Sequence, residues 1–154
     1  MLYNTINMSG EVYLPGDKSI AHRTIILASL LNAKSKIENI SHSQDISTTI
    51  HVLSQCGIES IIGTDSVKIL GGTLKEPKEV LECWGSGTTA RLITGLLCGL
   101  NYSFSLDGDD SLSKRPMERL LYHLRQVGAC LQYNGKLPII SRPSDHLTYG
   151  NFII

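Results

Sequence analysis

The sequence lacks an excess of charge of either sign. Its 154 residues carry 14 lysines and arginines against 14 aspartates and glutamates, so the formal net charge is zero. A dedicated nucleic-acid binder normally shows a basic excess, and this balance therefore argues against nucleic acid as a partner. The balance leaves room for a local cluster of cations in a binding site.

Long apolar runs and paired cysteines are also missing. The longest apolar stretches, at residues 25–31 and 96–100, are far too short to span a bilayer, and the N-terminus does not resemble a signal peptide. No membrane is therefore expected as a partner. No two cysteines form a C-x-x-C pair and no histidines have metal-ligand spacing, so no metal is predicted. We expect free, buried thiols in a cytoplasmic protein at Cys56, Cys83, Cys98 and Cys130.

The sequence contains a repeat with a period of about 70 residues. A Leu-x-x-x-Gly pattern ends at Gly57 and again at Gly128, a spacing of 71, and the loop at Ser19 matches the loop at Thr88 at a spacing of 69. Each unit predicts a strand, a glycine loop, a helix, a strand, a helix and a hairpin. The predicted fold class is therefore α/β, built from repeated βαβαββ units.

The two units span about residues 12–72 and 80–142, and residues 146–154 are typical of the opening strand of a third unit. The first helix is apolar over most of its surface and is expected to be buried. The dipeptide Asn134-Gly135 predicts a tight hairpin turn. The expected strands cover residues 12–14, 58–62, 67–70, 80–83, 102–106, 130–133 and 137–140. The expected helices run from about Ala21 to Leu31, from the N-cap Asp45 to Gly57, from Thr88 to Leu100, and from Pro116 to Gly128.

The strongest candidate site is the loop before the first helix, Gly16-Asp17-Lys18-Ser19. Backbone N–H groups at a helix start point outward and favour an anion. Lys18 adds a positive charge, Ser19 adds a hydroxyl donor, and Arg23 lies one helical turn further on. The alternative is that Ser19 caps the helix while the two cations extend into water. The pattern is not a P-loop, which needs Gly-Lys-Ser/Thr in direct succession.

A second loop of the same design occurs at the matching place in the second unit. Residues 84–91 read Trp-Gly-Ser-Gly-Thr-Thr-Ala-Arg, with Gly87 where a ligand can approach the backbone and Arg91 about one turn later. Thr88 or Thr89 is expected to cap the helix. Taken alone, the loop is more typical of an ordinary turn than of a binding site, but two loops in register across a repeat favour binding.

Two further cations, Lys114 and Arg115, precede the helix that starts at Pro116. Cations at the positive end of a helix are unfavourable unless an anion joins them, which favours a binding role. The alternative is that both side chains extend into water. No Ser/Cys–His–Asp set is apparent, so catalysis by such a triad is not predicted.

Together, these segments resemble the family of 5-enolpyruvylshikimate-3-phosphate synthases, the enolpyruvyl transferases of the shikimate pathway. The matching segments are residues 15–23, 87–91 and 114–117. They occur in the family's order and at its intervals, and they span nearly the whole chain. The resemblance implies a fold of two similar domains, each an inside-out α/β barrel of three repeated units. Residues 1–154 then form one incomplete domain, except that the strand in residues 1–14 is implied to belong to the other domain.

The family joins phosphoenolpyruvate to shikimate 3-phosphate and releases phosphate, in the biosynthesis of chorismate and the aromatic amino acids. The reaction passes through a tetrahedral intermediate and uses neither a metal nor another cofactor. The resemblance implies that Lys18 is catalytic and contacts both substrates. Both substrates are polyanions, which suits converging cations. The implied ligands of shikimate 3-phosphate are Lys18, Ser19 and Arg23, and those of phosphoenolpyruvate are Lys18, Gly87, Arg91 and Arg115.

Two departures from the family pattern bear on activity. The family loop usually reads Gly-Asn where this chain has Trp84-Gly85. Family members are also well over twice as long, and the part beyond this chain carries the acid/base residues and most of the other domain. We therefore expect this chain to bind substrate weakly and to be inactive alone.

Three alternatives stay open from the sequence. The chain is a non-catalytic anion-binding module, or it is one part of a split enzyme completed by a C-terminal fragment. The third alternative is the sister family that transfers enolpyruvyl to UDP-N-acetylglucosamine, which typically has Lys-Asn where this chain has Lys18-Ser19. A sheet edge left uncovered by an absent third unit would also favour self-association.

Overall fold

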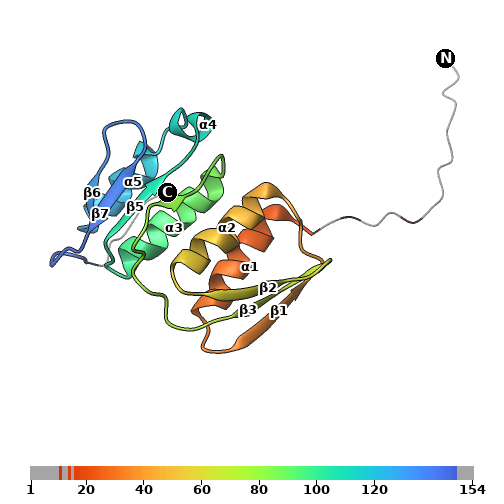
Figure 1. Ribbon diagram of the computed structural model, residues 1–154. Coiled ribbons are helices and arrows are strands. Elements are labelled where there is room, and N and C mark those ends of the chain that lie inside the picture. The colour runs from red at the N-terminus through yellow and green to blue at the C-terminus, as the bar shows by residue number, and fades with distance from the viewer. Residues whose placement is uncertain (1–10, 12–13, 15, 149–154) are drawn as a thin grey trace, which may run out of the picture.

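Figure 1 shows two α/β units, with helices lying between two separate β-sheets. This computed structural model describes residues 11, 14 and 16–148. The strand expected at residues 12–14 lies outside the described residues except for Leu14, which is in no strand. Most of the strand expected at residues 146–154 also lies outside them, and its described part forms a turn and irregular backbone.

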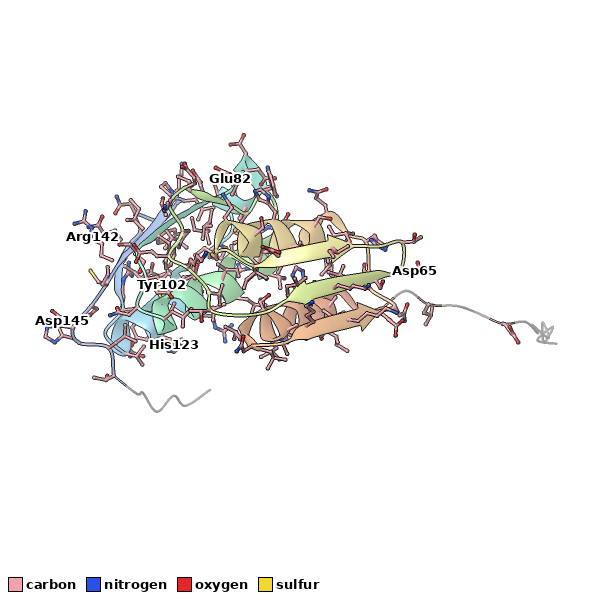
Figure 2. All side chains as sticks on the ribbon, turned by 60° about the horizontal axis from the view of Figure 1, so that its bottom comes forward. Asp65, Glu82, Tyr102, His123, Arg142 and Asp145 are labelled. Carbon is pink, nitrogen blue, oxygen red and sulfur yellow. The ribbon has the colours of Figure 1, made fainter. Side chains whose placement is uncertain are left out.

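The first unit contains two helices and a three-stranded antiparallel sheet. Its elements are α1 (Lys18–Leu30), β1 (Lys34–Glu38), α2 (Gln44–Gln55), β2 (Glu59–Ile62) and β3 (Ser66–Leu70). The strand order is β1-β3-β2. The hairpin expected between β2 and β3 is confirmed, with the Gly63 N–H donating to the Ser66 carbonyl at 2.8 Å. Asp65 in this turn lies at one end of the elongated molecule, far from Asp145 (Figure 2).

The second unit repeats this topology with an additional strand and an additional short helix. Its elements are β4 (Leu81–Glu82), α3 (Gly87–Gly99), β5 (Phe104–Asp107), α4 (Asp110–Ser113), α5 (Glu118–Gln126), β6 (Cys130–Gln132) and β7 (Ile139–Arg142). The strand order is β4-β5-β7-β6, with β4 and β5 parallel and the other neighbours antiparallel. The order β5-β7-β6 corresponds to β1-β3-β2 in the first unit.

Three helices, α1, α2 and α3, run side by side in the same direction between the two sheets (Figure 1). Their shared layer is apolar, and Ile25, Val52, Ile93 and Leu97 in it have no exposed surface. Burying a side chain of this size contributes about 1.5–3 kcal/mol. The N-terminal ends of the three helices therefore meet at one end of this layer.

The connection between the units, residues 71–80, is hydrogen-bonded to both of them. The Lys75 N–H donates to the Cys56 carbonyl of the first unit at 2.8 Å. From the second unit, the Tyr102 hydroxyl donates to the Leu74 carbonyl, also at 2.8 Å. Figure 2 shows Tyr102 in the middle of the molecule, where the two units meet. The connection is thus attached at both sides.

α1 begins at Lys18, three residues before its expected start. Asp17 caps it, because its backbone is extended and its carboxylate accepts a hydrogen bond from the Ile20 N–H at 2.8 Å. The alternative that Ser19 caps this helix is therefore wrong. Ser19 lies inside the first turn, and its exposed hydroxyl has no hydrogen-bond partner among the residues described.

α2 and α3 also have other N-caps than those expected. Ser43 caps α2 from extended backbone, which places Asp45 inside the first turn, where a negative charge favours the helix. Ser86 caps α3, with its hydroxyl accepting from the Thr89 N–H at 3.4 Å. Neither Thr88 nor Thr89 is the cap, because both already have helical positions in α3.

The prediction that α1 is buried over most of its surface is wrong for the face that α2 and the sheet leave uncovered. Ile25 and Ile26 are buried. Ile20 is 66% exposed, Leu27 is 63% exposed and Leu31, just after the helix, is 53% exposed. α1 therefore presents an apolar face to solvent.

The second hairpin forms, but with a shifted register. Cys130 pairs with Arg142 and Gln132 pairs with Ile140, so residues 133–138 all belong to the connection. A two-residue turn at Asn134-Gly135 would have paired Tyr133 with Lys136. Pro138, which follows a cis peptide bond, has no N–H to donate to a ladder, and β7 begins only after it.

Candidate anion-binding site

Two loops and one connection bring the residues proposed from the sequence to the shared N-terminal end of α1, α2 and α3. The α1 loop is residues 16–19, the α3 loop is residues 84–88, and the α4–α5 connection is residues 114–117. Helix N-termini carry unpaired N–H groups and a partial positive charge, so three of them side by side favour an anion.

Lys18 in the α1 loop forms an ion pair with Asp45 of α2. The Nζ and Oδ2 atoms are 2.7 Å apart, and the two side chains are 51% and 30% exposed. A pair this exposed contributes about 0–1 kcal/mol to stability. It therefore orients the ammonium group but leaves it able to bind another anion. Asp45 was expected only as a helix cap, and no sequence signal connects it with a lysine 27 positions away.

Arg23 lies beside Ser19 on the exposed side of α1. Its Nη1 atom donates to the Ser19 carbonyl at 2.9 Å, which holds the guanidinium close to the start of its own helix. The remaining N–H groups of the guanidinium and the Ser19 hydroxyl are donors that face no protein acceptor in the described part of the chain. The α1 loop therefore combines two cations with a free hydroxyl.

Gly87 in the α3 loop faces two guanidinium groups. A Cβ atom added at Gly87 would lie 2.7 Å from Nη1 of Arg91 and 3.3 Å from Nη1 of Arg115. Two backbone carbonyls hold Arg91 in place, since its Nη1 donates to Gly87 and its Nη2 donates to Pro116, each at 3.2 Å. Because glycine has no side chain, both guanidinium groups can approach the backbone at the start of α3 closely.

The three arginines of the site form no ion pair with the described residues. Within the part of the chain that the structure describes, no carboxylate oxygen lies within 4.0 Å of Arg23, Arg91 or Arg115. Arginine matches phosphate and carboxylate oxygens with parallel donors. Unpaired guanidinium groups beside helix N-termini are therefore arranged to bind anions rather than to stabilise the protein by ion pairs.

The electrostatic penalty predicted for Lys114 and Arg115 at a helix N-terminus is not present in the structure. The short helix α4 was not expected, and Lys114 is its C-cap. Cations are favourable at the C-terminal end of a helix, and α5 begins only at Glu118. The two cations therefore do not carry the penalty that the sequence argument assigned to them, and the case for Arg115 depends on its contact with Gly87.

A chain of buried hydrogen bonds joins the three helices beneath the two loops. Nδ1 of His22 lies 2.7 Å from Oγ1 of Thr49, which lies 2.7 Å from Oγ1 of Thr89, which in turn lies 2.7 Å from Oγ of Ser86. None of the four residues is more than 2% exposed. No pattern in the sequence indicates this chain, because its members come from three separate helices.

Burial lowers the pKa of His22 below its ordinary value of 6.5. The Asp45 carboxylate opposes this change in pKa, while the Lys18 and Arg23 cations add to it. Nε2 of His22 has no hydrogen-bond partner among the described residues. The imidazole is therefore neutral at pH 7 and is held through Nδ1 alone.

Trp84 takes the place where the resembled family usually has glycine, and its backbone explains that preference. Its φ of +43° lies in the left-handed region, which costs any residue with a Cβ atom. Its carbonyl accepts from the Asp109 N–H at 3.0 Å, and its ring lies 5.2 Å from that of His51. Trp84 is 41% exposed, so it covers the outside of α2 rather than filling the core.

The remaining candidate chemistry is limited. Cys56, Cys83 and Cys98 are buried free thiols, but Cys130 is exposed, so the expectation of burial is wrong for that residue. Among residues 16–148, no group of three or more His, Cys, Asp or Glu side chains is placed to hold a metal ion. None of the described helices combines the length and the apolar character needed to cross a bilayer.

Repeated α/β units with two cation-bearing loops at a shared helix end define an α/β protein with a candidate site for anions. The sequence profile of the family described as EPSP synthase (3-phosphoshikimate 1-carboxyvinyltransferase) matches residues 3–149. The chain belongs to this family.

Individual relatives agree with the family assignment. The 3-phosphoshikimate 1-carboxyvinyltransferase of Streptococcus mutans is 42% identical over 128 residues, which cover 81% of this chain and 30% of the relative. That of Lactococcus lactis subsp. cremoris is 36% identical over 157 residues, which cover 98% of this chain and 36% of the relative. The chain therefore spans about a third of the length of these relatives.

A solved structure confirms the predicted fold. EPSP synthase from Acinetobacter baumannii superposes with a TM-score of 0.82 at 31% identity, and the match covers 86% of this chain and 32% of that chain. The α/β arrangement of the enolpyruvyl transferase type is thereby confirmed, over about a third of the larger protein.

Proposed function

We propose that this chain is the N-terminal, substrate-binding part of a 3-phosphoshikimate 1-carboxyvinyltransferase. This activity transfers the enolpyruvyl group of phosphoenolpyruvate to shikimate 3-phosphate. The observation that carries the proposal is a set of arginines at a shared helix end in a member of this family, Arg23, Arg91 and Arg115. Within the described part of the chain, none of them has a carboxylate within 4.0 Å. Both substrates are anions that such a site is suited to bind.

The α1 loop is proposed to bind shikimate 3-phosphate. Lys18, Ser19 and Arg23 present an ammonium group, a hydroxyl and a guanidinium toward solvent at the start of α1. Phosphate oxygens accept from all three kinds of donor. Lys18 can exchange its exposed pair with Asp45 for a substrate oxygen, because such a pair contributes little.

The α3 loop is proposed to bind phosphoenolpyruvate. Gly87 lets the guanidinium groups of Arg91 and Arg115 approach the start of α3, where both are proposed to donate hydrogen bonds to the ligand. Lys18 is proposed to contact both substrates and to stabilise the charge that develops during their addition, which makes it the catalytic residue of this part. The chain's own residues thus bind and orient the two substrates.

The chain alone is proposed to be inactive, because it spans about a third of the length of its relatives. The exposed apolar face of α1, with Ile20, Leu27 and Leu31, supports a further polypeptide surface packing there in the active protein. That surface is either a C-terminal complementing fragment or a second copy of this chain. Three buried free thiols support a reducing compartment, the cytoplasm.

Calorimetric titration with shikimate 3-phosphate tests the binding role. We expect a dissociation constant of about 1 mM, or roughly 4 kcal/mol. Arg23→Ala should weaken binding at least about tenfold, since it removes charge-assisted hydrogen bonds. Arg142→Ala is the matched control, because Figure 2 shows Arg142 on the outer side of the second sheet and it is exposed. Absence of heat with the wild-type chain at millimolar ligand would contradict the proposal.

Fragment complementation separates an enzyme part from a non-catalytic module. The chain is mixed with the C-terminal two thirds of the Streptococcus mutans relative, and phosphate release from the two substrates is measured. We expect activity only in the mixture, and much less when the chain carries Lys18→Ala. Tight substrate binding without activity in any mixture would favour the non-catalytic module.

A further inference from the structure

The buried hydrogen-bond chain joins the helices that carry different parts of the proposed site. His22 lies one turn after Lys18 in α1, and Thr49 lies one turn after Asp45 in α2. Thr89 lies in the first turn of α3, directly after the α3 loop. Each of the three helices whose N-termini meet at the site therefore contributes one member of the chain.

Buried hydroxyl groups elsewhere in these helices serve their own helix. The hydroxyl of Thr48 donates to the Gln44 carbonyl at 3.0 Å, and that of Thr94 donates to the Ala90 carbonyl at 2.7 Å. Among the threonines that the structure describes, only Thr49 and Thr89 bond to side chains of other helices. The cross-helix contacts are thus a local arrangement and not a general property of this helix layer.

We propose that His22, Thr49 and Thr89 are positioning residues whose hydrogen-bond chain holds the α1 loop and the α3 loop in register. The proposal rests on the proposed function, because the two loops are assigned to the two substrates. Hydrogen bonds have narrow preferred distances and angles, so they limit sliding between helices more strictly than apolar contacts do. A slide of either helix would separate the cations that converge on the two anions.

The chain also has a direction, because each hydroxyl donates only one proton. The Asp45 carbonyl is a second acceptor for both threonines, at 3.3 Å from Oγ1 of Thr49 and 3.4 Å from Oγ1 of Thr89, but the contacts of 2.7 Å within the chain are shorter. With the proton of His22 on Nδ1, each member therefore donates toward the α3 loop, and the Ser86 hydroxyl is left to donate to an acceptor there. In the opposite direction His22 carries its proton on Nε2, which has no partner in the described part of the chain. Buried N–H groups without acceptors are rare in proteins. The outward direction is therefore favoured, and an anion in the α3 loop should favour it further.

The first test needs no ligand. In the full chain, the NMR signals of the His22 ring report its tautomer and surroundings. We expect Thr89→Val, which removes only the hydroxyl, to shift these signals although α2 lies between. Thr94→Val is the matched control on the same helix, because its hydroxyl donates only to the Ala90 carbonyl, and it should leave them in place. Unmoved signals in Thr89→Val, or equal shifts in both variants, would overturn the chain.

The second test measures binding of phosphoenolpyruvate in the presence of saturating shikimate 3-phosphate. Thr49→Val and Thr89→Val should each weaken it about three- to tenfold, which lies in the lower part of the range of measured couplings between contacting residues. Thr48→Val and Thr94→Val, the matched controls on the same helices, should change it by less than about twofold. His22→Asn, which keeps a polar atom near the Nδ1 position, should bind better than His22→Leu.

The outcomes separate the two proposals. A wild-type chain that binds neither substrate contradicts the proposed function, and the ring signals of His22 still decide whether the helices are coupled. Normal binding in Thr49→Val and Thr89→Val, with wild-type binding present, overturns the positioning role. If a valine variant does not fold, its amide spectrum shows this, and the comparison of His22→Asn with His22→Leu decides instead.

Discussion

Three N-cap side chains determine where α1, α2 and α3 begin, and therefore where the candidate site lies. Asp17, Ser43 and Ser86 precede α1, α2 and α3, and each accepts a hydrogen bond from the first turn of its helix. Each cap uses one of the unpaired N–H groups at its helix start, so the others remain for a ligand. The residue types are visible in the sequence. The choice between Ser43 and Asp45 is not, because two good caps lie within three positions.

Gly87→Ala is expected to weaken anion binding without weakening the fold. The added methyl group would lie 2.7 Å from Nη1 of Arg91 and 3.3 Å from Nη1 of Arg115, so the guanidinium groups proposed to bind the ligand would have to shift. The backbone of Gly87 is not left-handed and the crowded atoms are the ends of flexible side chains, so the fold should accommodate alanine. We expect phosphoenolpyruvate to bind at least about tenfold more weakly, measured by titration in the presence of shikimate 3-phosphate.

Gly95→Ala is the control for this prediction. It lies in the same helix, and an added Cβ there meets nothing within 4 Å. It should raise the melting temperature and leave binding unchanged. Equal affinities in Gly87→Ala and wild type would show that the close approach of Arg91 and Arg115 to Gly87 is not needed for binding.

Cys130 is expected to be the only thiol that reacts rapidly in the folded protein. Burial raises the pKa of Cys56 and Cys98 to about 11, and burial together with the Glu82 and Asp107 carboxylates raises the pKa of Cys83 to about 12. With an aromatic disulfide reagent at pH 8, we expect one fast thiol per chain, and all four after unfolding. Cys130→Ser should remove the fast phase, whereas a second fast thiol would contradict the burial described here.

Among the elements, those with strong local signals were the ones that could be predicted. Gly57 and Gly128 both have positive φ and follow the ends of α2 and α5, as their pattern indicates. The short helix α4 was missed because four residues carry no usable periodicity. The β6–β7 register was wrong because Asn134-Gly135 is a strong turn signal that Pro138 overrides.

The left-handed backbone at the start of the α3 loop leads to a prediction at Trp84. Both Trp84→Ala and Trp84→Gly lose the ring contact with His51, so comparing them isolates the backbone effect. Glycine tolerates the φ of +43° and alanine does not, so Trp84→Gly should be more stable by about 1 kcal/mol. Unfolding in denaturant measures the difference. If alanine were equal or better, the loop would have to relax out of this conformation.

On the scale of the whole molecule, the three segments that carry the proposed substrate-binding residues could be predicted from the sequence. The repeat made this possible, because it gives the two loops the same position in their units. The repeat could not show which side chains meet between units. Lys18 and Asp45 are 27 positions apart, and Thr49 and Thr89 are 40 positions apart. Their contacts depend on how the helices pack, and packing distances are not encoded in any local pattern.

The stability of the whole molecule is expected to fall as the pH drops below 6.5, in part because of His22. Burial lowers the pKa of His22 in the folded protein. Above pH 6.5 the residue is neutral in both states and stability is unaffected. Below pH 6.5 His22 binds a proton in the unfolded chain but not yet in the folded protein. The free energy of unfolding therefore falls by at most about 1.4 kcal/mol per pH unit, until the pH is below the pKa of His22 in the folded protein.

The matched variant is His22→Asn, which cannot titrate. Urea unfolding of both proteins between pH 7.5 and pH 5 should show a steeper loss for the wild type, while the carboxylates contribute equally to both. Parallel curves would mean that His22 titrates normally in the folded protein.

The connection at residues 71–80 has a consequence for how the protein unfolds. Two repeated units with separate sheets suggest two separate melting transitions. The connection, however, is bonded to the first unit through Lys75 and to the second through Tyr102, and α1, α2 and α3 share one apolar layer. Neither sheet can lose its helices without exposing the layer on which the other depends. The two units should therefore melt as one cooperative block, with a single calorimetric peak whose van't Hoff enthalpy equals the measured heat.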